Sequence, residues 1–167
     1  NALLRGLDCR INELSTLNVT QNLLLRSLIC LNNNLTSLNL QQNPSLLLLS
    51  CGLNQITSLD LSQNSALTDL YCNSNLLTNL NIKNNSSLNP NQFDFSANPT
   101  LQYICADEAE IAAVQTKING YGYTATCNVN AYCTFTPGGV FYTIDGSNRF
   151  DSNNNNCDSN DPVYPNL

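Results

Sequence analysis

Apolar and polar positions in the first part of the chain recur at one fixed interval. Cysteine, asparagine and leucine each return at the spacing that separates Cys9 from Cys30. The cysteine column is Cys9, Cys30, Cys51 and Cys72, the leucine column is Leu17, Leu38, Leu59 and Leu80, and the two asparagine columns are Asn12, Asn33, Asn54 and Asn75, and Asn1, Asn22, Asn43, Asn64 and Asn85. A period of this length is typical of stacked supersecondary units, so the pattern predicts a repeat solenoid. Such proteins mostly bind other molecules, which favours a binding function over catalysis.

Each copy has two alternating halves. Residues 25–35, 46–56 and 67–77 all read L-x-x-L-x-C-x-x-N-x-[LI], the leucine-rich-repeat pattern with cysteine in the third aliphatic slot. Alternation around the cysteine predicts parallel strands at about 7–9, 28–30, 49–51 and 70–72. The asparagine amide can bond backbone groups in the turn that follows. The back half alternates again, as in residues 35–40, and predicts a second short extended segment rather than a helix.

The fifth copy departs from the period. Residues 89–92 stand where a strand is expected after Leu88, and residues 93–101 match the back half of a repeat. On this alignment part of a repeat is missing, and we expect a shortened coil that bulges or kinks. Residues 101–104 are expected to restart the pattern.

The chain divides into three predicted segments. Residues 1–104 form the mainly β solenoid, residues 105–130 a C-terminal cap, and residues 131–167 the start of a β-rich partial domain or a linker. Within the cap, Ile111, Val114 and Ile118 have helical spacing after a run of acids. The first residue falls partway through a repeat, which suggests a piece of a longer protein.

Composition narrows the possible functions. Charged residues make up only 11% of the chain, the formal net charge is -6, and histidine is absent. Without a cluster of Lys and Arg, nucleic acid is not an expected partner. No long apolar run is present, so no membrane-spanning segment is expected. The absence of histidine excludes Ser-His-Asp and Cys-His catalysis, and the scattered acids do not suggest a hydrolase, so we expect no enzyme activity.

The cysteine column is expected to be reduced. Inward side chains on in-register parallel strands stack about 4.8 Å apart, whereas a disulfide requires Cβ atoms about 3.8 Å apart. Cysteine also behaves as a small buried hydrophobe. A linear column does not converge into a tetrahedral metal site.

A candidate binding face lies on the outward positions of the predicted strands. The candidate residues are Asp8, Arg10, Ser27, Ile29, Leu31, Leu48, Ser50, Asp69, Tyr71 and Asn73. Ile29, Leu31, Leu48 and Tyr71 would form an apolar patch with polar edges, which marks protein contacts more often than sugar contacts. The alternative is that these are scattered surface apolar residues, which occur on any protein.

An asparagine-rich loop near the end of the chain is a candidate calcium site. Its proposed ligands are Asp151, Asn153, Asn155, Asp158 and Asp161. Oxygen donors at alternate positions suit a hard cation such as Ca²⁺, the one cofactor considered. The alternative is a polar loop that joins two strands.

The repeats resemble the leucine-rich-repeat segments of secreted surface proteins of Bacteroidota, which read L-x-x-L-x-C-x-x-N-x-L-T-x-L-D-L-S-x-N-P-x. Residues 56–64 and 43–46 match this pattern closely. The resemblance implies export by the type IX route to the bacterial surface. It also implies a cap stapled by Cys105 and Cys127, with both thiols free as the alternative. Cys133 with Cys157 is a further suggested pair.

The calcium-site candidate carries a second resemblance, to the opening of B-type repeat domains of bacterial adhesins. The matching residues are Gly146, Phe150, Asp151, Asn153, Asn155 and Asp158. That family has a calcium-associated β-sandwich, of which the chain could hold only the beginning.

Three functional hypotheses follow. The first is a non-catalytic adhesion module that binds a protein or glycan at the cell surface through its concave face. The second is a structural subunit of a larger outer-membrane complex. The third is an ancillary module of a secreted hydrolase whose catalytic domain lies elsewhere.

Overall fold

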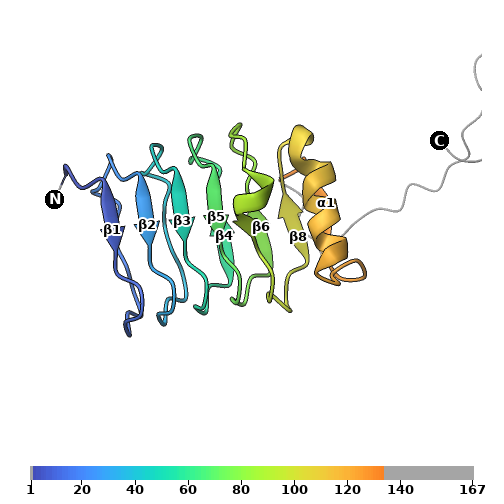
Figure 1. Cartoon of the computed structure of the whole chain (residues 1–167), viewed down its shortest axis with the longest axis horizontal. Helices are drawn as coiled ribbons and strands as arrows, with labels where there is room; N and C mark the ends of the chain where they lie inside the picture. The colour runs from blue at the N-terminus through green and yellow to red at the C-terminus, as the bar shows by residue number, and fades with distance from the viewer. Residues whose placement is uncertain (1, 134–167) are drawn as a thin grey trace, which may run out of the picture. The chain divides into compact units, whose positions relative to one another are not determined.

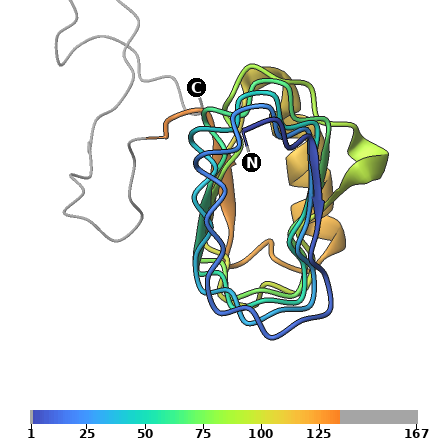
Figure 2. The same ribbon diagram turned by 90° about the vertical axis from the view of Figure 1, so that its left-hand side faces the viewer.

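The computed structural model describes residues 2–133 of the 167-residue chain. These residues form stacked coils that run from the N-terminal β1 to a helix at the other end (Figure 1). Viewed along the stack, the coils superimpose as a ring with two long sides, and each long side carries one sheet (Figure 2). The calcium-site candidate and the predicted third segment beyond Cys133 lie outside the described residues.

The first sheet is parallel throughout. Its strands, in spatial order, are β1 (Gly6–Asp8), β2 (Ser27–Ile29), β3 (Leu48–Ser50), β5 (Asp69–Tyr71) and β7 (Phe93–Asp94). Leu7 pairs with Leu28, Leu28 with Leu49, and Leu49 with Leu70, so each step from β1 to β5 equals the period of the sequence. The parallel strands were predicted correctly, but each ends just before its cysteine and not on it.

The second sheet is also parallel. Its strands are β4 (Ser58–Asp60), β6 (Asn79–Asn81), β8 (Tyr103–Cys105) and β9 (Asn128–Asn130). Strands β4 and β6 occupy the back halves of two repeats, which confirms the predicted second extended segment there. Leu59, Leu80 and Ile104 lie in register at the centres of β4, β6 and β8.

The core fills the space between the two sheets. Its columns are Leu25, Leu46 and Leu67; Leu28, Leu49 and Leu70; Cys30, Cys51 and Cys72; Leu35, Ile56 and Leu77; and Leu40, Leu61 and Ile82, all with no exposed surface. The three buried cysteines carry no disulfide, as predicted, while Cys9 is half-buried in the first coil. Alternation places Leu28, Leu49 and Leu70, and the cysteine two residues after each, inward because the pleat turns every second residue to one face.

Asparagine side chains close each turn and tie it to the preceding coil. The side-chain amide nitrogen of Asn54 donates to the backbone carbonyls of Cys30 and Cys51 at 3.1 Å. Its side-chain oxygen accepts from the backbone N–H of Leu35 at 2.9 Å. Asn33, Asn75 and Asn98 repeat this set of bonds in their own turns. The predicted role of this column is thereby confirmed, because each amide satisfies backbone groups that the sharp turn leaves without partners.

The residue before each of these asparagines adopts the left-handed conformation. The positions are Ile11, Asn32, Leu53, Ser74 and Ala97, with φ between 52° and 56°. Such a conformation costs a non-glycine residue roughly 1–2 kcal/mol. The asparagine bonds on both sides of the turn offset that cost.

A second asparagine ladder runs along the turns that lead back to the first sheet. The Asn43 amide donates to the Asn22 carbonyl at 2.9 Å, and Asn64 donates in the same way to Asn43. In the next coil the buried residue that continues the ladder is Asn84, at 3.1 Å from the Asn64 carbonyl. The predicted member Asn85 is exposed instead, with φ of 57°. The ladder therefore slips to the adjacent residue where the period begins to fail.

The fifth coil is longer than the others, which corrects the predicted deletion. Phe93 pairs with Leu70, a longer step along the chain than that from Leu49 to Leu70, so β7 belongs to the first sheet and not to a back half. A 3₁₀ turn at Pro90–Gln92 takes up the additional length before β7. Residues 103–105 then form the back strand β8, where a new repeat was expected. Phe95 and Asn98 take the places of the column cysteine and of the turn asparagine.

A helical segment covers the end of the coils. A 3₁₀ turn at Glu108–Glu110 leads into α1 (Ile111–Gly120), whose Val114 and Ile118 are buried as their spacing predicted. The Asp107 carboxylate accepts from the amides of Asn84 and Asn85 at 3.1 and 2.8 Å. Glu110 accepts from the Leu88 amide at 2.8 Å. Two acids thus bind the last turn of the stack, where a further coil would otherwise supply acceptors.

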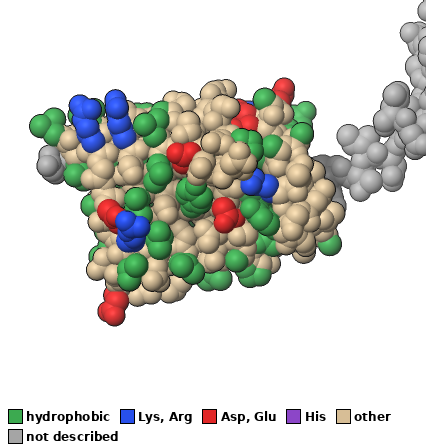
Figure 3. All heavy atoms as spheres, viewed as in Figure 1, with side chains coloured by type: hydrophobic (Ala, Val, Ile, Leu, Met, Phe, Trp, Pro, Cys, Tyr) green, Lys and Arg blue, Asp and Glu red, His purple; other side chains and the backbone are tan. Residues whose placement is uncertain are grey.

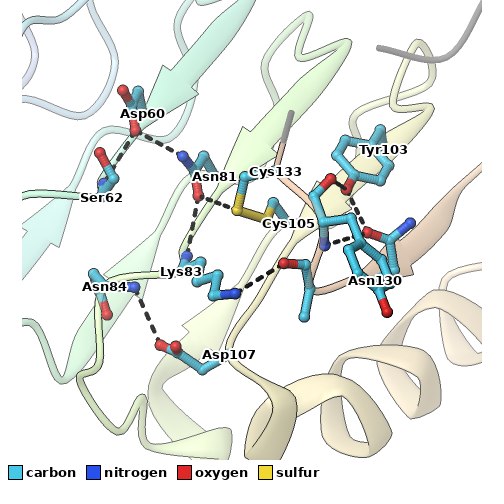
Figure 4. The surroundings of a disulfide bond; sticks show 12 residues. Asp60, Ser62, Asn81, Lys83, Asn84, Tyr103, Cys105, Asp107, Asn130 and Cys133 are labelled. Atoms are coloured by element: carbon cyan, nitrogen blue, oxygen red, sulfur yellow. Dashed lines mark hydrogen bonds between the residues drawn. A yellow bond between two sulfur atoms is a disulfide. The ribbon is translucent and has the colours of Figure 1, made fainter. Parts of the chain in front are cut away.

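The disulfide joins Cys105 to Cys133 and not to Cys127, so both suggested pairings of these cysteines are wrong (Figure 4). Ile104 points inward, and therefore its neighbour Cys105 faces outward on the second sheet. Cys127 precedes β9 and is 3% exposed, which places it in the core as a free thiol. Residues 131–133 return across β8, where the Lys83 ammonium bonds the Ala131 carbonyl at 2.9 Å.

Candidate binding surfaces

The outer face of the first sheet carries three columns of side chains. Two columns come from the outward positions of the strands, and the third from the position two residues after each strand ends. Register along the strands gives Gly6, Ser27, Leu48 and Asp69 in one column, and Asp8, Ile29, Ser50, Tyr71 and Asp94 in the next. The third column holds Arg10, Leu31, Gly52, Asn73 and Ser96. The structure thus places all ten predicted face residues on one surface.

The middle of this face is apolar and its first coil is charged. Ile29, Leu31, Leu48 and Tyr71 are all half-buried, so each offers part of its side chain to solvent. In the first coil Arg10 and Asp8 are exposed and bind each other at 2.7 Å. An exposed pair of this kind contributes about 0–1 kcal/mol, so its charges remain accessible to a partner.

Close contact between neighbouring coils flattens one part of the face. A Cβ added at Gly52 would lie 2.7 Å from the Asn73 side-chain oxygen and 3.1 Å from the Asn73 carbonyl oxygen. Glycine at this position lets the Asn73 side chain fold back over the preceding coil. Leu31 and Asn73, two of the three predicted face residues in the third column, therefore border a position that cannot carry a side chain without displacing a neighbour.

The far end of the face is built by residues that sequence reasoning missed. The Tyr71 hydroxyl donates to the Gln92 side chain, and the Tyr121 hydroxyl donates to Asp94 at 3.1 Å. Burial raises the pKa of Tyr121 to about 12, and the Asp94 charge adds to the rise. Lys117 lies 5.8 Å from the centre of the Phe93 ring, within the range of a cation–π contact. The residues beyond Tyr71 come from the 3₁₀ turn at Pro90–Gln92, from β7 and from the helical segment, whose places in the fold the repeat pattern did not reveal.

The outer face of the second sheet is polar. Its outward residues include Ser37, Asn39, Ser58, Asp60, Asn79 and Asn81. Asn39 and Asp60 accept the amide two residues ahead, at 3.1 and 3.0 Å, so their side chains fix the turn and not a ligand. A shallow depression of about 200 Å³ lies between Ser37, Gln41 and Asp60. Alternation in the back half could have identified this second face.

The described residues hold no cluster of metal-ligating side chains, and burial makes the inner thiols poor nucleophiles. Among residues 2–133 there is no group of three or more Cys, Asp or Glu that could hold a metal ion. Burial raises the pKa of Cys30 to about 12 and that of Cys127 to about 11, which keeps these thiols protonated. The helix found in this part of the chain is too short and too polar to cross a membrane.

Comparisons with known proteins found similarity to solved structures. No protein-family model matches the chain. No curated protein sequence matches it. Among solved structures, the chain is similar to the functional domain of InlJ from Listeria monocytogenes, which is described as including a cysteine ladder. The two are 34% identical with a TM-score of 0.45, and the match covers 64% of this chain and 26% of that chain. The chain thus spans about a quarter of the protein that it matches.

Proposed function

We propose that the stacked coils are a leucine-rich-repeat solenoid that serves as the non-catalytic binding module of a secreted surface protein. Its partner is a protein, which contacts the outer face of the first sheet. The observation that carries this proposal is the placement of Ile29, Leu48 and Tyr71 in two neighbouring columns of one sheet face, each half-buried. Partly exposed apolar and aromatic side chains surrounded by polar ones are typical of protein interfaces.

The chemistry of the face favours a protein over a glycan. Tyr71 is the one aromatic side chain on the described strands β1, β2, β3 and β5 of this face, and its hydroxyl is bonded to Gln92. Ile29, Leu31 and Leu48 offer aliphatic surface, which gains from contact with apolar side chains and not with sugar hydroxyl groups. The second sheet is polar and its side chains are occupied by turns, so it is the weaker candidate.

The disulfide supports a place outside the cytoplasm. Bonds such as Cys105–Cys133 persist in oxidising compartments and are rare in the cytosol. The exposed Cys133 would be reduced readily in a cell interior. Secretion to the bacterial surface is part of this proposal, together with the resemblance to Bacteroidota surface proteins.

A pair of matched double variants tests the proposed face. Leu48→Asp with Tyr71→Asp places charge in the apolar centre, whereas Ser58→Asp with Asn79→Asp places the same charge on exposed positions of the second sheet. Immobilised protein is used to capture partners from surface extracts, with identification by mass spectrometry and affinity from a titration of the purified partner. We expect the first variant to weaken binding about 100-fold and the second to leave it unchanged.

Other outcomes would separate the remaining hypotheses. Unchanged partner binding in the Leu48→Asp, Tyr71→Asp variant would remove the proposed face. Recovery only as part of a stoichiometric membrane complex would favour the structural subunit. Binding to purified surface polysaccharide, with no protein captured, would favour a glycan ligand or a module of a secreted hydrolase.

A further inference from the structure

Two arginines occupy the same position in consecutive coils, just before strands β1 and β2. The Arg26 amide donates to the Arg5 carbonyl at 2.7 Å, and the Leu47 amide donates to the Arg26 carbonyl at 2.8 Å. The three residues therefore follow one another along one edge of the first sheet. Neighbouring strands are about 4.8 Å apart, so the two guanidinium groups start from backbones at that spacing.

The two arginines have no acid to neutralise them. Both side chains are exposed, and within residues 2–133 the one ion pair is that between Arg10 and Asp8. Like charges on directly neighbouring strands repel and destabilise the sheet. The pair is therefore a local excess of positive charge on a chain whose formal net charge is -6.

Exposed leucines surround this pair. Leu23, Leu24 and Leu47 are 54%, 42% and 41% exposed, although Leu25 between them is fully buried. Leu24 and Arg26 lie on either side of buried Leu25, so both point away from the core. Figure 3 shows Lys and Arg side chains side by side near the N-terminal end of this face, with hydrophobic side chains to either side. We call Arg5, Arg26, Leu23, Leu24 and Leu47 the Arg–Leu edge.

We propose that the Arg–Leu edge is a docking site for a polypeptide segment that carries carboxylates next to apolar side chains. Each guanidinium presents a planar fork of donors that matches a carboxylate in two parallel hydrogen bonds. The leucines supply the apolar contact, and a bound acid removes the repulsion between the arginines. None of these residues belongs to the outer face described above, so binding at the two surfaces can be tested independently.

The charge distribution favours a polypeptide over the other anionic macromolecules. Stable attachment to an anionic bilayer through basic residues takes clusters of about four to eight Lys and Arg. Nucleic-acid binding likewise draws on many phosphate contacts, at about one cation each. The edge offers two cations on an acidic chain, which suits a short segment with two or three acidic residues.

The test uses a short fluorescein-labelled peptide in which pairs of Glu alternate with single Leu, titrated against the full chain at low salt by fluorescence anisotropy. The double variant Arg5→Gln, Arg26→Gln should lower the affinity about tenfold or more, because it removes the charged donors. Arg10→Gln is the matched control, since Arg10 follows β1 whereas Arg5 precedes it, and should change the affinity less than about twofold.

A second pair of variants tests the apolar part. Leu24→Ser with Leu47→Ser should weaken peptide binding about tenfold, because each loses apolar contact area. The control Leu76→Ser changes a leucine of similar exposure, 45%, on another side of the coil and should have no effect. A peptide with Ser in place of Leu should bind the unaltered protein more weakly, by a similar factor.

Thermal unfolding gives a readout that does not depend on the chosen peptide. Arg26→Gln should raise the Tm at low salt and lose this effect at high salt, because it relieves a repulsion that salt screens. An unchanged or lowered Tm would show that the charge is already balanced and would overturn the proposal. Equal loss of binding in Arg10→Gln, preference for phosphatidylserine vesicles over the peptide, or a dimer that Arg5→Gln and Arg26→Gln disrupt would overturn it as well.

Discussion

The repeated coils and the closing segment are held together in different ways. In the coils, between Leu25 and Ile82, one set of contacts recurs, and Asn33, Asn54 and Asn75 bond equivalent groups in successive turns. In the closing segment, from Cys105 to Cys133, each contact occurs once. Its parts are the acids Asp107 and Glu110, the Tyr123 hydroxyl that accepts from the backbone N–H of Asn98, and the disulfide.

This difference indicates where a local defect can spread. An inner coil has neighbours on both sides, so the stability of the stack depends on every interface between coils. The closing segment has the stack on one side only, and its loss opens one end. A defect in the coils should therefore lower the stability of the whole molecule, whereas a defect in the closing segment should act mainly near α1 and β9.

The largest effect is expected for Asn54→Ala. This change removes the side-chain bonds to the Cys30 and Cys51 carbonyls and leaves the buried Leu35 amide without its acceptor. The free energy of unfolding should fall by about 3 kcal/mol in a urea titration, because buried groups lose their partners. The control Asn39→Ala affects an exposed side chain that bonds the Gln41 amide at 3.1 Å, and should cost less than about 1 kcal/mol. Equal costs would show that the inner ladder does not couple the coils.

Removal of the disulfide should have a smaller and more local effect. Cys133→Ser opens a loop between residues 28 positions apart and should cost about 2 kcal/mol. Hydrogen exchange should accelerate in β9 and at residues 131–133 while β2 and β3 stay protected. A reductant should have no further effect on this variant. A peptide map of the non-reduced protein that joins Cys105 to Cys127 would contradict the arrangement.

A single hydroxyl tests the contact between the closing segment and the fifth coil. In Tyr123→Phe the backbone N–H of Asn98 loses the hydroxyl acceptor that lies 2.7 Å away, while the ring can still pack near Phe95. We expect a loss of about 1 kcal/mol in thermal or urea unfolding. Tyr121→Phe, which loses a bond to the half-buried Asp94, serves as the comparison and should cost less. A larger loss in Tyr121→Phe would show that the Tyr121 hydroxyl, and not that of Tyr123, contributes more to stability.

The smallest expected effect concerns pH. Burial raises the pKa of Glu110 from its ordinary value of 4.5, and its second carboxylate oxygen has no hydrogen-bond partner in the described structure. The folded protein therefore binds this proton more tightly than the unfolded chain does. Stability from this group is gained as the pH falls through the raised pKa toward the unfolded value, and is lost as the pH rises.

Glu110→Gln isolates this contribution. The difference in unfolding free energy between the unaltered protein and the variant should shift by a few tenths of a kcal/mol in favour of the unaltered protein between pH 7 and pH 4, because solvent screens a half-buried group. Urea titrations at several pH values measure it. Glu108→Gln, at an exposed neighbour, is the control. A shift of opposite sign would show that the Leu88 bond outweighs burial.

The same comparison explains what the sequence could predict. The columns of the coils could be predicted because each coil requires an inward Leu or Cys and an asparagine side chain in its turn at the same positions. The fifth coil was misassigned because Phe93, Asp94 and Phe95 repeat the alternation of Leu59, Asp60 and Leu61 in a back strand. Two strands as short as β1 and β4 look alike in such a pattern. The pairing of Phe93 with Leu70, together with the bond from the Asn98 side-chain amide to the Cys72 carbonyl, places this segment in the first sheet.

The disulfide pairing could not be predicted from the sequence for a different reason. The cysteines Cys105, Cys127 and Cys133 all follow the regular repeats, so no column fixed their direction. Inward placement of Ile104 decides that Cys105 faces outward, and this depends on its register with Leu80. The Arg–Leu edge was missed because it precedes the strands, whereas the candidate face was chosen from the strands themselves.

The constant step between β2, β3 and β5 has a consequence for how such a chain can change in evolution. Each of these strands meets its neighbours at the same interval along the chain and through equivalent contacts, so a whole coil could be duplicated or deleted among them without altering the others. The binding surface would grow or shrink by one row of side chains. The fifth coil is not interchangeable in this way, because its longer step from Leu70 and its contacts with Tyr121 and Tyr123 fit only the closing segment. Gene duplication can thus vary the reach of the surface while the same end piece is kept.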